Sequence, residues 1–339
     1  MKKRILIVRI DRIGDVVLTT SLPREIKKKY PDSFVAVLVR SYTKDIFLEN
    51  PFIDEIIIAD EMLNCSKMDV LKFSKQISSY NFTHSFLILP NEKINYILFF
   101  AGIKHRYGTG HKFYQFITGT KGISRNKYIP LRHEADYCMD FVRKLGIETN
   151  NINPQIFLSE EEKIYSLRIK QNLLFNNEAK YLIGIHSGSG NSAPNWKTEI
   201  YKQLILELTK RNHLKIVVTD NKIPQEIKNL ENVSYLNEGV ELRESIKNIS
   251  ILDCLISAST GPLHIAAGLS VKTVSVFCPL TACSPKLWGP LGNNGQVILP
   301  SEKYCKNFCP LDPKKCHYEG EEGLKIESVL EKIDKLFIK

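Results

Sequence analysis

One stretch decides how this chain is built, Ile5-Leu6-Ile7-Val8-Arg9-Ile10-Asp11-Arg12-Ile13-Gly14-Asp15-Val16-Val17-Leu18-Thr19-Thr20. Its four leading apolar residues predict a short buried strand, and the apolar positions after Asp15 recur at helical intervals. Gly14 lets the backbone turn between the two elements. We therefore expect a strand, a glycine turn and a helix, with Asp15 at the carboxyl end of the strand, where α/β proteins place their chemistry. An acidic residue in the first turn of a helix is also an ordinary cap, so the local sequence leaves both roles open.

Short apolar runs alternate with helical patterns along the rest of the chain. In the first part we expect further strands at 34–39, 53–59, 82–89 and near residue 106, with helices at 68–80, 93–101 and 134–145. Residues 146–154 have the composition of a linker, with three Asn and one Pro. The alternation then restarts, with strands at 181–186, 214–219, 252–257 and 273–277 separated by helices.

This alternation predicts an α/β protein whose parallel sheets carry helices on both faces. We expect two Rossmann-like, doubly wound domains, residues 1–150 and 151–339, that face each other across a cleft, because ligands bind between such domains. The closing helix, 326–337, is a candidate to cross back to the first domain.

The composition is that of an ordinary globular protein, with 43% hydrophobic and 25% charged residues among 339. The richest apolar run, 94–101, is far shorter than the ~20 residues that a membrane span needs. The Lys-Lys-Arg segment near the start runs directly into the first strand, so we expect no signal peptide and a cytoplasmic location.

The formal net charge is +10, which favours polyanionic partners such as nucleotide diphosphates, anionic lipid head groups or nucleic acid. The chain contains no RNP motif, zinc-finger pattern or basic stripe interleaved with stacking aromatics. We therefore expect no nucleic-acid partner.

A second strand-to-helix turn follows about 245 residues after the first, at 255–268. Ser259 or Thr260 can cap the helix, Gly261 allows close approach, and Pro262 suits the first helical position. The amides and the positive dipole end of such a helix suit a phosphate group, to which His264 can add a hydrogen bond. A purely structural helix start explains the capping residues equally well.

A third turn, 187–197, follows the strand 181–186 and is rich in Gly and Ser. Its amides and hydroxyls also suit phosphate oxygens. It lacks the full G-x-x-x-x-G-K-[ST] pattern, which disfavours a P-loop nucleotidase. We expect Trp196 to pack beneath the loop.

Taken together, these segments resemble glycosyltransferase family 9, the heptosyltransferases that build the inner core of lipopolysaccharide. The resemblance is carried, in order, by residues 9–18, 101–108, 133–137, 187–196 and 259–268. It implies a GT-B fold, with the acceptor on the N-terminal domain and an ADP-heptose donor on the C-terminal one. It also implies transfer with inversion and no cofactor or metal required for catalysis.

By position, Asp15 matches the catalytic carboxylate of that family, which takes the proton from the acceptor hydroxyl as it attacks the anomeric carbon of the donor. The resemblance further implies donor contacts at Ser189, Gly190, Lys197, Asp220, Ser259, Thr260, Gly261 and His264. Of these, Thr260, Gly261 and His264, with Ser189 and Gly190, would stabilise the charge on the departing ADP in place of a metal ion. Asp220 is instead a candidate for contacts with the nucleoside.

Two positions depart from the family's pattern. Some heptosyltransferases carry a Lys two residues before the loop Trp, where this chain has Pro194, and an Asp where it has Ser259. The charge of the leaving group would then fall to Lys197 or Arg12, and these departures also fit a donor with another nucleotide-activated sugar.

Basic side chains in loops of the N-terminal domain are candidates to meet phosphorylated sugars of a lipopolysaccharide core acceptor at the inner membrane surface. On most proteins such charges are merely solvated. The acceptor-binding candidates are Arg12, Arg40, Arg106 and Lys112.

Three of the eight cysteines form a cluster, Cys305-x3-Cys309-x6-Cys316, in a polar segment. Cysteines of a cytoplasmic protein are rarely paired in disulfides, and thiolates hold zinc or iron. The spacing lacks the common C-x2-C pairs, so a structural Zn or Fe site and unbound thiols both stay open. The resemblance adds that protein-glycosylating relatives use such a cluster to hold iron.

Other functions fit parts of the same pattern. A related transferase could use another nucleotide sugar or glycosylate protein, as autotransporter-type heptosyltransferases do. A sugar-nucleotide epimerase of GT-B type would convert the donor without an acceptor. A nucleotide-sugar or polyanion binding module would bind without turnover and would tolerate Asp15→Asn.

Overall fold

A computed structural model describes the chain except residues 1, 67, 176–177, 191–192, 321 and 338–339. It divides into two compact units, residues 1–157 and 158–339. The boundary lies seven residues beyond the expected one, because Arg24 donates hydrogen bonds to the carbonyls of Asn151 and Asn153, and Gln155 N donates to Thr20 Oγ1 (2.9 Å). The end of the linker therefore packs on unit 1.

Unit 1 is built around a six-stranded, all-parallel sheet in the order β3-β2-β1-β4-β5-β6. Its strands are β1 (Arg4–Val8), β2 (Phe34–Val39), β3 (Glu55–Ile58), β4 (His84–Leu87), β5 (His105–Thr109) and β6 (Lys121–Ile123). Its helices are α1 (Ile13–Val17), α2 (Ser21–Lys29), α3 (Asp60–Asn64), α4 (Asp69–Ser78), α5 (Glu92–Phe100), α6 (Phe113–Thr118) and α7 (Glu134–Arg143), with 3-10 turns at Ser41–Ile46 and Asn126–Tyr128.

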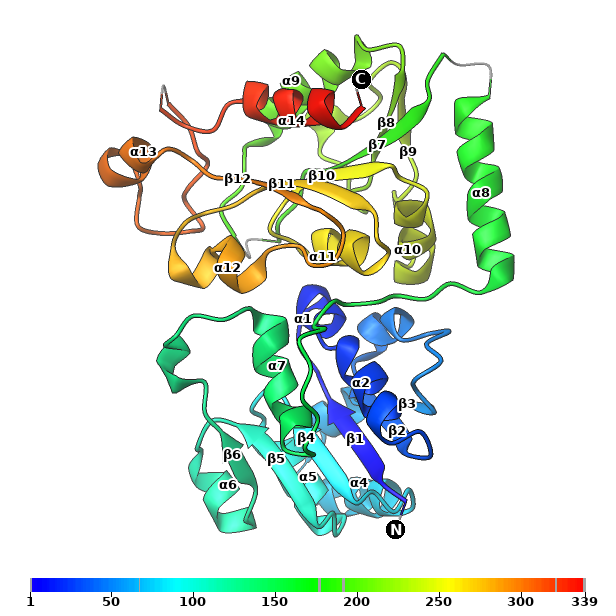
Figure 1. Ribbon diagram of the computed structural model, residues 1–339, viewed down its shortest axis with the longest axis vertical. Coiled ribbons are helices and arrows are strands. Elements are labelled where there is room, and N and C mark those ends of the chain that lie inside the picture. Colours follow the sequence, from blue (N-terminus) through cyan, green and yellow to red (C-terminus); the bar gives the residue numbers. More distant parts are fainter. Residues whose placement is uncertain (1, 67, 176–177, 191–192, 321, 338–339) are drawn as a thin grey trace. The chain divides into compact units, whose positions relative to one another are not determined.

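Strand β1 lies inside this sheet, with Ile7 opposite Val37 of β2 and Phe86 of β4. Leu6 and Val8 pack into the core that α4 and α5 cover, and α2 and α7 lie together on the other face (Figure 1). This double burial explains the uninterrupted apolar run of the strand. The order of the strands reverses between β1 and β4, so the carboxyl end of β1 lies at a switch point, where such folds bind ligands.

The segment after β1 differs from the expected single helix. The short helix α1 ends at Val17 and α2 begins at Ser21. Between them, Thr19 and Thr20 turn their hydroxyls back onto the carbonyls of Val16 and Val17 (2.6 and 2.7 Å), which tightens the backbone. Gly14 lies within α1 and is not among the glycines with positive φ, so the turn is not one that only glycine could make.

Unit 2 repeats the architecture with a parallel sheet in the order β12-β11-β10-β7-β8-β9. Its strands are β7 (Tyr181–His186), β8 (Leu214–Val218), β9 (Val233–Tyr235), β10 (Cys254–Ala258), β11 (Lys272–Val276) and β12 (Gln296–Ile298). Its helices are α8 (Glu160–Leu174), α9 (Thr198–Thr209), α10 (Leu242–Ser250), α11 (Gly261–Gly268), α12 (Pro285–Trp288), α13 (Glu302–Asn307) and α14 (Ile326–Phe337), with 3-10 turns at Gln225–Ile227 and Thr281–Cys283.

Helix α14 belongs to unit 2. Val329 and Ile333 are buried in the core that α9 forms with this sheet, and Arg211 pairs with Asp334 (3.0 Å). The closing helix therefore packs on the domain from which it extends. With two six-stranded parallel sheets, each covered by helices on both faces, the α/β expectation is confirmed.

Candidate active site

A buried charge network lies at the carboxyl end of β1. Arg9 is only 2% exposed, and its guanidinium contacts three carboxylates. Its Nη2 donates to Asp15 Oδ1 (2.7 Å), its Nη1 donates to Glu134 Oε1 (3.3 Å), and its Nε lies 2.8 Å from Asp11 Oδ1 as an ion pair without hydrogen-bond geometry. Asp15, the residue predicted to be catalytic, is thus fixed by an arginine of its own strand end.

Glu134, in the first turn of α7, also binds a second arginine, because Arg125 Nη2 donates a hydrogen bond to Glu134 Oε1 (2.9 Å). The network therefore combines two arginines with three carboxylates, and both Arg9 and Glu134 are almost fully buried. A buried ion pair needs several hydrogen bonds to offset its lost hydration, and this arrangement supplies them. Sequence reasoning found Asp15 but gave Arg9, Asp11, Glu134 and Arg125 no role, because nothing local pairs residues 125 positions apart.

Burial raises the pKa of Asp15 above its ordinary value, the contact with Arg9 opposes this, and the charge of Glu134 raises the pKa further. The same balance raises the pKa of Asp11 to about 6, with burial as the largest cause. A carboxylate with a raised pKa is a stronger base once ionised. The network thus holds Asp15 in one orientation without removing its basicity.

Two of the four predicted acceptor-binding residues lie close to this network. Arg12 is the exposed residue immediately before α1, and its charge acts on the pKa of Asp15. Tyr42 donates its hydroxyl to the carbonyl of Asp11 (2.6 Å), and the guanidinium of Arg40 lies 5.1 Å from the centroid of the Tyr42 ring. Two arginines therefore lie beside the Asp11–Asp15 turn, and one of them, Arg40, also pairs with Asp60 (3.8 Å).

In unit 2, the carboxyl ends of β7 and β10 are neighbours, because these strands pair at the point where strand order reverses. The glycine-rich loop leaves β7 and the turn 259–261 leaves β10, so the fold brings both predicted phosphate sites to one edge of the sheet. Asp220 follows β8, the next strand along.

The Asp220 carboxylate is committed to that loop. Its Oδ2 accepts a hydrogen bond from Ser187 N (2.9 Å) and its Oδ1 accepts one from Gly188 N (2.8 Å). A Cβ on Gly188 would lie 3.2 Å from Asp220 Oδ1, which explains the glycine. The backbone amides of Ser187 and Gly188, which we expected to bind phosphate, therefore donate to Asp220 instead. Ser189 and Gly190 follow these two residues, and Gly190 has a left-handed backbone conformation (φ +54°).

The start of α11 is the better anion site. Thr260 lies just before the helix in an extended conformation, and Pro262 occupies an early position that needs no amide hydrogen. The Thr260 side chain is 6% exposed, and its hydroxyl has no hydrogen-bond partner among the described residues. Gly261 begins the helix and His264 is buried within its first turn. A buried hydroxyl beside helix amides is an arrangement that an anionic oxygen would satisfy.

The profile of the family described as Glycosyltransferase family 9 (heptosyltransferase) matches residues 70–316. The chain belongs to glycosyltransferase family 9. A Haemophilus influenzae protein that carries only the general description of a glycosyltransferase is 25% identical over 99% of this chain and 97% of its own length. Lipopolysaccharide heptosyltransferase 2 of Escherichia coli is 22% identical over 87% of each chain. The structure of the E. coli ADP-heptose lipopolysaccharide heptosyltransferase II superposes with a TM-score of 0.73 at 18% identity, covering 99% and 98% of the chains, which confirms the GT-B fold.

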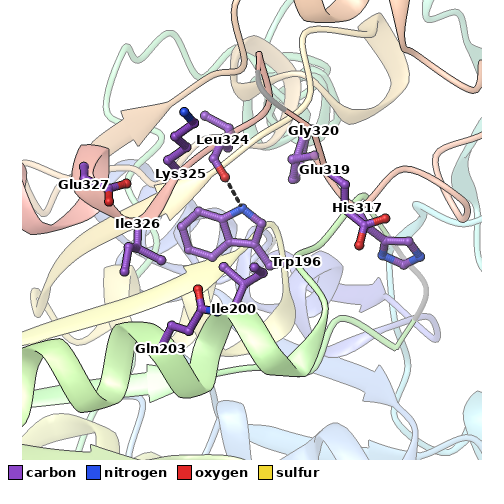
Figure 2. Close-up of a pocket in the computed structure, with 11 residues that line it drawn as sticks. Trp196, Ile200, Gln203, His317, Glu319, Gly320, Leu324, Lys325, Ile326 and Glu327 are labelled. Carbon is purple, nitrogen blue, oxygen red and sulfur yellow. Dashed lines mark hydrogen bonds between the residues drawn. The ribbon is translucent and has the colours of Figure 1, made fainter.

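In this family 9 glycosyltransferase, Trp196 packs beneath the glycine-rich loop as expected. It is 3% exposed, donates Nε1 to the carbonyl of Leu324 (2.9 Å), and meets the Tyr201 ring edge to face. Its ring lines a cavity of about 410 Å³ together with Ile200 of α9 and Ile326 of α14, and Figure 2 shows these three side chains near one another, with the bond from Trp196 to Leu324 dashed. Lys197, the next residue, pairs with Glu319 (2.7 Å), so its ammonium is shared with a carboxylate.

The segment after α13 fastens the same loop. His317 Nδ1 lies 3.0 Å from the carbonyl of Asn195, and Asn195 N donates to the carbonyl of Cys316 (3.3 Å). The pKa of the Cys305 thiol is raised, first by burial and then by Cys309 and Cys316, so the three predicted thiols lie near one another. Even so, no three His, Cys, Asp or Glu side chains among the described residues are placed to hold one metal ion. The metal stays a prediction of the sequence.

Arg106 of this glycosyltransferase lies near the amino end of β5, level with Leu6 of β1, whereas the Asp15 network lies at the carboxyl end of β1. The Arg106 guanidinium donates to the carbonyls of Ile103 and Thr118 and lies 5.1 Å from the Phe99 ring centroid, so it ties α6 to the loop before β5. Lys112 is exposed immediately before α6. Across the parts of the chain that the structure describes, no helix combines the length and apolar character needed to cross a bilayer.

Proposed function

We propose that this chain transfers heptose from ADP-heptose to an anionic lipopolysaccharide inner-core acceptor, with inversion, without a metal in the catalytic step, and with Asp15 as the general base. The observation that carries the proposal is the Arg9–Asp15 contact, which holds a carboxylate of raised pKa at the switch point of unit 1. The family and a heptosyltransferase relative support the choice of reaction.

In the proposed step, the acceptor oxygen attacks the anomeric carbon of the donor, the bond from that carbon to ADP breaks, and the acceptor proton passes to Asp15. Since Arg9 holds Oδ1, the proposal assigns the proton to Oδ2. A positioned general base typically contributes about 10²–10⁴-fold to the rate. Arg9 keeps the carboxylate from rotating. This restraint holds Asp15 in a fixed orientation, as proton transfer requires.

The charge of the departing ADP is assigned to the start of α11. The Thr260 hydroxyl, the amides that follow Gly261 and the His264 ring would stabilise the diphosphate, in place of a metal ion. Ser189 and Gly190 are proposed as further phosphate contacts. Asp220 acts through the loop that it clamps, and Lys197 would contribute only by exchanging Glu319 for phosphate.

Acceptor binding is proposed for Arg12 and Arg40, which flank the Asp15 network, and for Lys112. Such an acceptor places the enzyme on the cytoplasmic side of the inner membrane as a peripheral protein. A second candidate function is transfer of another nucleotide-activated sugar, or glycosylation of protein. It is favoured by Ser259 and Pro194, which stand where some heptosyltransferases have Asp and Lys.

Titration calorimetry without added metal tests the donor, with ADP-heptose compared against UDP- and GDP-sugars. We expect preference for ADP-heptose in the wild type and in Asp15→Asn, and weaker binding in Thr260→Val. Thr209→Val, at the end of α9, is the matched control and should bind as the wild type does. Preference for another nucleotide, or none, would overturn the heptosyltransferase assignment. Core-truncated lipopolysaccharide then tests the acceptor.

A further inference from the structure

Helix α6 buries polar side chains and exposes apolar ones, the reverse of an ordinary surface helix. Its buried side chains are polar, Gln115 and Thr118, whereas Phe113, Phe116 and Ile117 are exposed by 79%, 84% and 55%. A surface helix ordinarily turns its apolar side inward. In Figure 1, α6 lies beside β6, the strand at the edge of the unit 1 sheet. The apolar side chains of α6 are thus presented to whatever lies outside the domain.

Polar bonds hold α6 in this orientation. Gln115 Nε2 donates to the carbonyl of Thr109 (3.2 Å), and Gln115 Oε1 accepts from Lys112 N (2.8 Å). Asn95 of α5 donates to Thr118 Oγ1 and accepts from Thr120 Oγ1, both at 2.9 Å in the interior. A rotation that buried the phenylalanines would leave these groups unsatisfied, which is costly. The exposure of the aromatic rings is therefore fixed by the sequence.

The neighbouring helix extends the exposed apolar area. Phe99 and Phe100 at the end of α5 are exposed, α5 packs on α6, and Arg106 joins the two through Thr118 and the Phe99 ring. We call Phe99, Phe100, Phe113, Phe116 and Ile117 the aromatic surface. Exposed apolar side chains grouped on two helices that pack together indicate an interaction site.

The charge around the aromatic surface is mostly positive, although the exposed Glu92 at the start of α5 lies near Tyr114 of α6. Residues 93–133 contain eight Lys and Arg and not one Asp or Glu, while the whole chain carries +10. Lys104, Lys112 and Lys121 are exposed on the segments that border the surface, and none of them pairs with a carboxylate in the described structure. A collar of lysines around aromatic side chains matches an anionic lipid surface, with the rings at the acyl boundary and the ammonium groups at the phosphates.

We propose that the aromatic surface docks this enzyme onto a bilayer rich in anionic phospholipid. A second copy of the chain fits poorly, because apposing two such surfaces would bring their lysine collars together. The inference deepens the proposed function, since a lipid-anchored acceptor lies at such a bilayer. Binding to lipid alone needs neither donor nor acceptor, so the two proposals can fail separately.

Co-sedimentation of the full chain with vesicles tests the docking. We expect binding to vesicles of phosphatidylethanolamine and phosphatidylglycerol, little binding to phosphatidylcholine vesicles, and weakening by salt. Phe113→Ser/Phe116→Ser should lower the partition coefficient at least about tenfold. Lys104→Gln/Lys121→Gln should lower the partition coefficient roughly fivefold for each lysine removed. Lys112 is not substituted, because it is proposed to bind the acceptor. Leu167→Ser/Phe175→Ser, exposed in unit 2, is the matched apolar control and should bind as the wild type.

Three results would overturn the docking. These are equal binding to anionic and neutral vesicles, full binding by Phe113→Ser/Phe116→Ser, or a dimer in sedimentation velocity that this variant abolishes. The thermal midpoint and ADP-heptose affinity of each variant, measured without lipid, show that the fold and donor site are intact. Failure of the donor titration with lipid binding retained would remove the proposed function and leave the docking.

Discussion

Asp15 Oδ1 lies 2.7 Å from Arg9 Nη2, and the guanidinium that makes this contact is almost completely buried. A neighbouring cation alone would lower the pKa of the carboxyl, yet burial and the charge of Glu134 outweigh it, and the pKa of Asp15 is raised. Arg9 therefore supplies orientation, and the carboxylates around it preserve basicity.

Replacing Asp15 with Asn should remove the base but keep its shape. We expect kcat to fall by about 10²–10⁴-fold, with donor affinity and thermal midpoint nearly unchanged, because donor contacts are assigned to unit 2. Steady-state kinetics and calorimetry check this. Asp32→Asn, an exposed carboxylate of unit 1, should behave as the wild type. Lost donor affinity or a lost fold in Asp15→Asn would refute its role as a base.

The pH profile should carry the signature of the network. A base must be ionised, so kcat/KM should fall as the pH drops through the pKa of Asp15, and this limb should lie above the ordinary value of 3.8. Glu134→Gln removes a charge that raises this pKa, so the limb should move to lower pH. Glu61→Gln, exposed on α3, is the control. A limb that stays in place, or rises, in Glu134→Gln would contradict this coupling.

Removing the central cation should destabilise unit 1. Arg9→Met leaves Asp11, Asp15 and Glu134 close together, with Arg125 bonded to Glu134 and the exposed Arg12 as the remaining positive charges. Breaking a buried ion pair in this way typically costs about 3–5 kcal/mol. Urea unfolding followed by circular dichroism measures the loss, and the exposed Arg12→Met should change the free energy of unfolding by less than about 0.5 kcal/mol. A loss under about 1 kcal/mol for Arg9→Met would show that the network is not a structural unit.

Asp220→Ala should loosen the glycine-rich loop. The amides of Ser187 and Gly188 lose their acceptors, so their hydrogen exchange should speed up and donor affinity should fall. Asp220→Asn keeps one acceptor oxygen and should be intermediate. If Asp220 instead contacts the nucleoside, affinity would fall in Asp220→Ala while the exchange of these two amides stayed as in the wild type.

Much of the fold follows from short-range pattern. Apolar runs of five or six residues between turns became the central strands, and the Ser159–Glu162 spacing forms a capping box at the start of α8. The three-residue edge strands β6, β9 and β12 were missed, since a segment such as Lys121–Ile123 is too short to show a period. The break between α1 and α2 was missed because it depends on the back-bonding of two threonine hydroxyls.

The candidate site divides in the same way. Asp15 and Thr260 were found because each sits at a strand-to-helix turn, a position that sequence reveals. The partners of Asp15 were not, because Glu134 reaches Arg9 only when α7 packs on the sheet. Asp220 was predicted near the nucleoside, but its bonds to Ser187 and Gly188 depend on strand order, which no local pattern encodes.

The bonds that hold the glycine-rich loop affect when the loop can fold during synthesis. Asn195 is held by His317 and Trp196 by Leu324, partners that follow by 122 and 128 residues. A ribosome adding about 5–20 residues per second needs on the order of ten seconds to cover that distance. During this interval unit 1 can already be complete, and Asp220 can hold the Ser187 end of the loop, while Asn195 and Trp196 still lack these two partners. The far end of the glycine-rich loop is therefore fixed only after most of unit 2 has been synthesised, and well after the turn that carries Asp15.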